Sequence, residues 1–254
     1  GQKKKKNKLN LYDRKSIESI DLEIFPDGGI SLKLGDIPDS ELPNISICTP
    51  TADRRWIFPL AIRNFYNFIY PKNKVEWIIL DDGENKIEEI IPRDPRVKYI
   101  YNPKKLDISS KRNKLVDLSK NDIIVFMDDD DYYAPESLLA RVKALVKYSK
   151  NGVGCVGCID VATFDIRVNK CSICSNGESY LTESSLAFTK EFHKQRSFRS
   201  GEKASEYRYF MEYRQNQMRS LPFQFVTIAL SHDKNTTGEL RAMTSGVNEA
   251  ENMK

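Results

Sequence analysis

The sequence predicts an α/β protein with a mainly parallel central sheet and helices on both faces of that sheet. From residue 45 onward, short apolar runs of strand length alternate with segments whose apolar residues recur at helical spacing. Polar clusters lie where the apolar runs end, which is where ligands bind in sheets of this class. The chain has 254 residues, of which 40% are hydrophobic and 30% charged, so it can bury a sizeable core.

Residues 1–42 are expected to precede the main domain as a basic disordered tail and a small β-hairpin. The formal net charge of +4 is concentrated in Lys3–Lys6 and Lys8, and such a run is typical of a solvated tail. Between residues 20 and 34, apolar residues alternate on either side of the strong turn sequence Pro26-Asp27-Gly28-Gly29. This alternation predicts two paired strands around the turn.

The main domain is expected to span residues 43–241 and to begin with alternating strands and helices. In its first half we predict strands at 45–49, 75–80, 97–101 and 123–127, with helices at 54–68 and 109–118. Ser109 or Ser110 is the expected cap of the second of these helices, and a third helix follows Pro135. In the second half we predict strands at 153–164, 166–174, 185–189 and 223–230, a helix over 204–217, and a tail at 242–254.

The four consecutive carboxylates of Asp128–Asp131 are the most informative stretch of the chain. They follow the apolar run 123–127 directly, and carboxylates packed this closely repel one another unless a cation compensates them. Hard oxygen ligands at a strand end suit Mg2+ or Mn2+ bound jointly with the phosphates of a substrate. Alternate side chains at a strand end share a face, which favours Asp128 and Asp130 acting together. The alternative is a solvated acidic turn.

Four of the five cysteines form the pairs Cys155-x-x-Cys158 and Cys171-x-x-Cys174, a spacing that approaches a four-thiolate zinc site. However, residues 153–164 are expected to be strand, in which positions three apart point to opposite faces. Neither pair is followed by the glycine that zinc knuckles normally need. We therefore expect the four cysteines to be reduced thiols along two neighbouring strands. The alternative is that the chain is a non-catalytic domain that binds zinc or nucleic acid.

Further motifs stand in a fixed order along the chain. They are Thr49-Pro50-Thr51, the block from Glu76 to Gly83, Lys111-Arg112-Asn113, Met127–Tyr133, Ser184–Phe188, Glu206-x-x-x-Phe210 and His232–Thr237. This set, which runs from Ile45 to about Arg241, resembles an inverting family 2-like glycosyltransferase with the GT-A fold. The four aspartates and the late His-x-x-Asn-Thr are similar to a branch of that family found in large DNA viruses.

The resemblance implies a nucleotide-binding half at 43–131 and an acceptor half at 132–241. Thr49, Pro50 and Thr51 would then form the loop near the base and ribose. Asp82 would accept a hydrogen bond from the base, with Asp81 as the alternative, although either could cap the following turn. Lys111 and Arg112 would contact the nucleotide or diphosphate; otherwise they lie on a solvated helix face.

The resemblance also implies Mn2+ or Mg2+ as cofactor, with Asp130 as the principal ligand. Asp128 would approach the ribose or a water on the metal, and Asp129 would lie beside the nucleotide sugar; Asp129 and Asp131 could exchange roles with their neighbours. His232 would complete the metal shell or contact the diphosphate, unless it is structural.

An inverting transfer also needs a general base close to the acceptor hydroxyl. Glu206 matches the family position at the start of a helix, although Tyr207 replaces the usual second acid. Glu202 is the alternative, and a glutamate in a first helical turn also complements the helix dipole.

Among the other polar and aromatic residues, Trp56 is expected in the core and His193 at the surface.

The implied partners are a nucleotide sugar, with a UDP-sugar favoured, and a glycan or a protein- or lipid-linked acceptor. We expect no nucleic-acid partner. No apolar run reaches membrane-spanning length and no apolar segment near the start resembles a signal, so we expect a cytoplasmic location, in the host if the protein is viral. A nucleotidyltransferase is the other enzyme class to consider, but its usual Gly-rich loop is missing after the first strand, where residues 49–55 contain no glycine.

Overall fold

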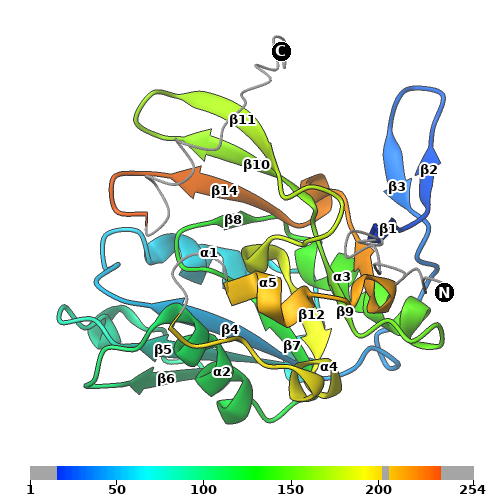
Figure 1. Ribbon diagram of the computed structural model, residues 1–254. Helices are drawn as coiled ribbons and strands as arrows, with labels where there is room; N and C mark the ends of the chain where they lie inside the picture. Colours follow the sequence, from blue (N-terminus) through cyan, green and yellow to red (C-terminus); the bar gives the residue numbers. More distant parts are fainter. Residues whose placement is uncertain (1–15, 202–205, 236–254) are drawn as a thin grey trace, which may run out of the picture.

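The computed structural model describes residues 16–201 and 206–235 and places a large twisted sheet at the centre of the molecule (Figure 1). The strand order is β1-β13-β9-β12-β7-β4-β5-β6, and among these described strands β12 alone runs antiparallel to both of its neighbours. The bounds are β1 Glu18–Ser19, β4 Ile45–Thr51, β5 Val75–Asp81, β6 Val97–Tyr101, β7 Ile123–Phe126, β9 Cys155–Gly157, β12 Ala187–Thr189 and β13 Met218–Ser220. The predicted α/β class with a mainly parallel sheet is confirmed.

Helices cover both faces of this sheet because the central strands are apolar on both sides. Along β5, Trp77 and Ile79 join one buried cluster, whereas Ile78 and Leu80 join the other. The first cluster packs against α1 Pro59–Asn67 and α3 Ser137–Ser149. The second packs against α2 Ile108–Leu118, α4 Lys190–Gln195 and α5 Glu206–Met211. Five short 3-10 turns lie at Lys72–Lys74, Glu88–Ile90, Glu183–Ser185, Gln215–Gln217 and Phe223–Phe225.

A second, four-stranded sheet lies beside the central one (Figure 1). Its order is β11 Lys170–Ser175, β10 Asp160–Asp165, β14 Thr227–Ser231 and β8 Tyr132–Tyr133. β8 follows the acidic run immediately, and β14 pairs with it so that Thr227 lies opposite Tyr133. This pairing brings residues near the end of the described chain to the end of β7.

The predicted N-terminal hairpin is present as β2 Leu22–Ile24 and β3 Ile30–Leu32, with Leu22 paired to Leu32. It projects away from both sheets (Figure 1). The preceding strand β1 pairs in parallel with β13 and so extends the central sheet, which the sequence did not indicate. The basic run of residues 3–8 and the tail at 242–254 lie outside the described residues.

Three predictions about the bounds of helices were wrong. The helix expected from residue 54 begins only at Pro59, after Asp53 with a positive φ of 57°. The cap of α2 is Asp107, whose Oδ1 accepts the backbone N–H of Ser110 at 2.8 Å. The helix expected to reach residue 217 ends at Met211. In the part of the chain that the structure describes, no helix is long and apolar enough to cross a membrane.

The cysteine pairs occupy different environments. Cys155 and Cys158 are fully buried in and beside the central sheet, whereas Cys171 is exposed and Cys174 half-buried on β11. Among the described residues, no group of three or more His, Cys, Asp or Glu side chains could hold a metal ion. The two pairs therefore do not come together as four thiolates within residues 16–201 and 206–235.

We predict that thiol reactivity divides the cysteines into two classes. Burial raises the pKa of the Cys48 and Cys158 thiols to about 12 and raises that of Cys155 as well, so these residues hold almost no thiolate near neutral pH. Iodoacetamide should therefore label Cys171 and then Cys174 in the native protein, as followed by peptide mass spectrometry. As the matched control, all five cysteines should react at equal rates once the protein is denatured. Equal rates in the native protein would contradict the burial of Cys48, Cys155 and Cys158.

Candidate active site

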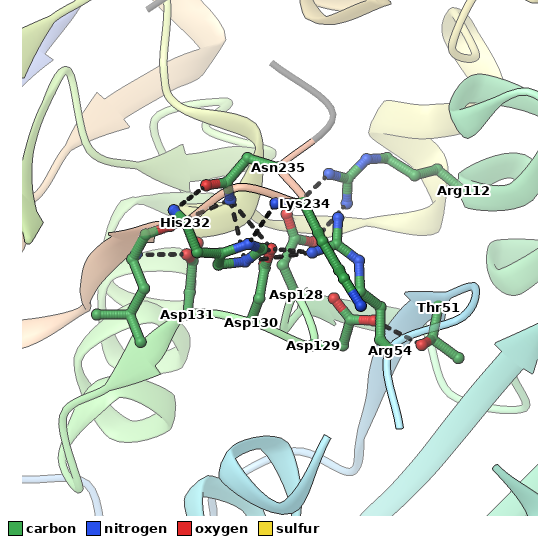
Figure 2. A network of polar contacts seen from close by, with 11 residues as sticks. Thr51, Arg54, Arg112, Asp128, Asp129, Asp130, Asp131, His232, Lys234 and Asn235 are labelled. Carbon is green, nitrogen blue, oxygen red and sulfur yellow. Dashed lines mark hydrogen bonds and ion pairs between the residues drawn. The ribbon is translucent and has the colours of Figure 1, made fainter. Parts of the chain in front are cut away.

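Polar side chains gather at the carboxyl ends of β4, β5 and β7, which are neighbours in the central sheet. These ends carry Thr49–Thr51, Asp81-Asp82 and Asp128–Asp131, as the sequence predicted. Residues of the segment after β14 join them from the second sheet (Figure 2). The site therefore lies between the edge of the central sheet and the start of the second one.

The four aspartates point alternately outward and inward. The side chains of Asp128 and Asp130 remain 23% and 13% exposed, whereas Asp129 and Asp131 are buried. Asp131 Oδ1 accepts the backbone N–H of Leu230 at 3.1 Å and so ties β14 to the acidic run. The expectation that Asp128 and Asp130 share a face agrees with this geometry.

Asp130 is at the centre of the polar network in Figure 2, where three nitrogens converge on its Oδ2. His232 Nε2 lies 2.9 Å from this oxygen, Arg54 Nη1 3.1 Å and Asn235 Nδ2 3.2 Å. His232 Nδ1 accepts the backbone N–H of Lys234 at 3.1 Å, which assigns the imidazole proton to Nε2 and makes Nε2 the donor to Asp130.

These neighbours decide the charge state of Asp130. Burial disfavours its ionised form, but the hydrogen bond from His232 and the positive charge of Arg54 outweigh that penalty and lower the pKa of Asp130. Asp129 behaves in the opposite way. Burial, reinforced by the negative charge of Asp130, raises its pKa to about 7, although Thr51 Oγ1 donates a 2.5 Å hydrogen bond to its Oδ2.

Asp128 is paired with an arginine of its own. Arg112 Nη1 and Nη2 lie 3.1 and 3.2 Å from its two carboxylate oxygens, and the guanidinium sits 4.6 Å from the centre of the Phe126 ring. The Asp128 backbone N–H donates to the Tyr133 hydroxyl at 2.9 Å, and that hydroxyl donates to the carbonyl of Ser184. The acidic run is thus fixed to the start of β8 and to the segment before β12.

Lys111 is also buried, so a solvated helix face is wrong for Lys111 and Arg112 alike. Lys111 Nζ donates to Asp82 Oδ1 at 2.5 Å and to the carbonyl of Thr51 at 3.0 Å. Burial lowers the pKa of this amine although the charge of Asp82 opposes the shift. The lysine joins the ends of β4 and β5.

Several of the other expected contact residues have internal partners. Asp81 caps the turn after β5 by accepting the N–H groups of Gly83 and Ile87, the alternative that the sequence left open. Thr49 Oγ1 accepts from Trp77 Nε1 at 2.8 Å, and Pro50 is buried within β4. Glu206 is the first residue of α5. Glu202 lies outside the described residues.

Two further residues belong to this site although the sequence did not assign them to it. Arg54 contacts Asp130, and Trp56 is 47% exposed with its ring 5.0 Å from that of His232, so its expected core position was wrong. Both follow the Thr49–Thr51 motif closely, which was the available signal. His193, expected at the surface, is instead buried and bonded to Asn113 Oδ1 at 2.8 Å.

The donor set of this site fits a divalent cation that arrives with further oxygen ligands. Asp128 and Asp130 offer hard carboxylate oxygens, the type that Mg2+ and Mn2+ prefer. Each carboxylate is already paired with an arginine, and the described residues offer no preformed cage of three or more metal-binding side chains. These residues therefore suit a cation that brings oxygen ligands of its own better than they suit an isolated ion.

Comparison with known proteins agrees with this arrangement. A glycosyltransferase of Haemophilus influenzae described as uncharacterized is 30% identical over 111 residues, which are 42% of this chain and 44% of that protein. This chain therefore aligns with less than half the length of that relative.

Among solved structures, the mannosyltransferase PcManGT of Pyrobaculum calidifontis, in complex with GDP-Man and Mn2+, superposes with a TM-score of 0.62 at 14% identity, covering 82% of this chain and 66% of that one. S. aureus TarS in complex with UDP-GlcNAc superposes with a TM-score of 0.59 at 14% identity, covering 76% and 60%. These likenesses confirm the GT-A fold. The model of glycosyl transferase family 2 matches residues 46–210, more than half of the chain, and the chain belongs to that family.

Proposed function

We propose that this chain transfers a sugar from a nucleoside-diphosphate sugar to an acceptor hydroxyl, with a divalent cation and with inversion at the anomeric carbon. The supporting observation is the pair Asp128 and Asp130, which face outward at the end of β7 among Arg54, Arg112 and His232. Two acids and three basic side chains suit a ligand made of a cation and a diphosphate. Membership of family 2 favours sugar transfer over the nucleotidyl transfer considered above.

The nucleotide is assigned to the ends of β4 and β5. Thr51 and Asp82 lie there within one buried network, joined by Lys111, which would fix the two strand ends over which the base and ribose bind. Thr49, Pro50 and Asp81 are buried and would support the nucleotide site through their contacts inside the protein. Solved relatives of this fold carry either GDP-Man or UDP-GlcNAc, so both uridine and guanosine donors need testing, with uridine favoured by the family resemblance.

Asp130 and Asp128 would hold Mn2+ or Mg2+, with His232 completing the set or contacting the diphosphate. When bound, the cation stabilises the negative charge that builds up on the departing diphosphate. Arg112 holds Asp128 in place, and Asp129, buried against Thr51, keeps the run packed against β4. Nε2 of His232 would have to give up its proton for the imidazole to act as a ligand through that atom.

The acceptor hydroxyl needs a base, which we assign to Glu206 at the start of α5, with Glu202 as the alternative. The carboxylate would take the proton of the hydroxyl as its oxygen attacks the anomeric carbon, and the bond to the diphosphate breaks in the same step. One displacement inverts the configuration. The acceptor is expected to be a glycan or a protein- or lipid-linked hydroxyl.

A screen of nucleotide sugars tests the donor half of this proposal. We predict that at least one UDP- or GDP-sugar is hydrolysed slowly with Mn2+ and not after chelation, as measured by release of the nucleoside diphosphate. Asp130→Asn should remove the metal-dependent release because it removes a charged ligand. Asp160→Asn, on the exposed start of β10, is the matched control. Full metal-dependent release by Asp130→Asn, with an unchanged melting temperature, would exclude the assignment of the metal to Asp130.

The acceptor half is tested by Glu206→Gln. This change keeps the shape of the side chain but removes its ability to accept a proton, so transfer should fall by roughly two to four decades while donor affinity changes little. Glu202→Gln should be mild by comparison. The product should have the inverted anomeric configuration by NMR. Retained configuration, or normal transfer by Glu206→Gln together with an inactive Glu202→Gln, would refute the assigned base or the single displacement.

A further inference from the structure

Arg54 is held at the edge of the site by the loop that follows β4. Asp53 adopts a positive φ of 57°, and its Oδ1 accepts the backbone N–H of Asn85 at 2.8 Å. The loop packs so closely on Gly83 that a Cβ at this glycine would lie 2.4 Å from the Asp53 nitrogen. The backbone that carries Arg54 is therefore fixed by the turn after β5, and its side chain reaches across to the acidic run (Figure 2).

The guanidinium of Arg54 lies against Oδ2 of Asp130, one of the two carboxylate oxygens that this residue offers a cation. Nη1 lies 3.1 Å from Asp130 Oδ2 and 3.2 Å from His232 Nε2, and only 12% of the Arg54 side chain is exposed. With His232 and Asn235, it leaves Oδ2 surrounded by nitrogen groups at 2.9 to 3.2 Å. A divalent ion cannot bind this oxygen while all three groups remain in place. They fill the space around the oxygen, and Arg54 already supplies the positive charge that the carboxylate attracts.

Arg54 and Arg112 differ in how firmly they hold their aspartates. Arg112 grips Asp128 with two parallel contacts and lies over the Phe126 ring. Arg54, among the described residues, contacts Asp130 through Nη1 alone. A single contact gives way more easily than a bidentate one, so Arg54 is the arginine that can exchange partners.

We propose that Arg54 competes with the divalent cation for Asp130 and moves to the diphosphate when the cation binds. The proposal rests on the proposed function, in which Asp130 is a metal ligand and the substrate carries a diphosphate. The cation alone then binds weakly, because it must first displace Arg54 from its ion pair with Asp130. A nucleoside diphosphate supplies both oxygen ligands for the cation and a new acceptor for the guanidinium. Metal and nucleotide therefore bind cooperatively, each raising the affinity of the other by the same factor.

The test is Arg54→Met, with Arg55→Met as the matched control. Arg55 is the next residue along the chain but pairs with Glu89 on the surface at 2.6 Å. Binding of Mn2+ alone, measured by EPR of the free ion, should tighten about tenfold in Arg54→Met, the effect of removing a competing charge. Affinity for UDP or GDP at saturating Mn2+ should fall, so the two effects have opposite signs. Arg55→Met should leave both affinities unchanged.

Two further variants identify the cause. In the Asp130→Asn background, Arg54→Met should no longer tighten Mn2+ binding, because the carboxylate for which they compete is gone. Arg54→Gln, which keeps a hydrogen-bond donor without the charge, should behave like Arg54→Met and replaces it if that variant does not fold.

The outcomes separate this inference from the proposed function. Unchanged Mn2+ affinity in Arg54→Met, with weakened binding in Asp130→Asn, overturns the competition alone. Weakened Mn2+ binding in Arg54→Met overturns it as well, since Arg54 would then support the metal. Unchanged Mn2+ binding in Asp130→Asn itself overturns the metal site on which the proposed function depends.

Discussion

Four adjacent carboxylates at the end of β7 impose the constraint on which the rest of the site depends. Ionised side chains this close repel strongly in a partly buried setting, so each needs its own compensation. Each receives a different one: Arg112 for Asp128, the Thr51 hydroxyl and a raised pKa for Asp129, Arg54 with His232 and Asn235 for Asp130, and a backbone N–H for Asp131. The network that results places the side chains of Arg54, Arg112 and His232 around Asp128 and Asp130.

The fold delivers these partners from distant parts of the chain. Arg112 comes from α2, Arg54 from the loop after β4, and His232 from the end of β14. The pairing of β14 with β8 matters most, because β8 begins at the residue after the acidic run and so fixes the distance between Asp130 and His232. The geometry around Asp130 therefore depends on both sheets.

Periodicity in the sequence was sufficient for the strands β4, β5, β6 and β7 of the central sheet, for the hairpin, and for the alternation of Asp128 and Asp130 with their neighbours. These features depend on a residue and those close to it. The sequence was insufficient where a long-range partner decides: the burial of Lys111 follows from Asp82, and the place of Arg54 follows from Gly83 and Asp130. The cap Asp107 was missed because two serines follow it, and one of them is the residue that it caps. The role of Glu206 rests on the family resemblance and its place at the start of α5.

The central claim is that the outward carboxylates and a nucleoside diphosphate hold one cation between them. Pulsed EPR of Mn2+ with the protein and UDP or GDP tests it most directly, because coupling to phosphorus and immobilisation by the protein are read from the same ion. We expect phosphorus coupling in a protein-bound Mn2+ signal that is lost in Asp130→Asn and kept in Asp160→Asn. A protein-bound signal without phosphorus coupling, or one that survives Asp130→Asn unchanged, would contradict it.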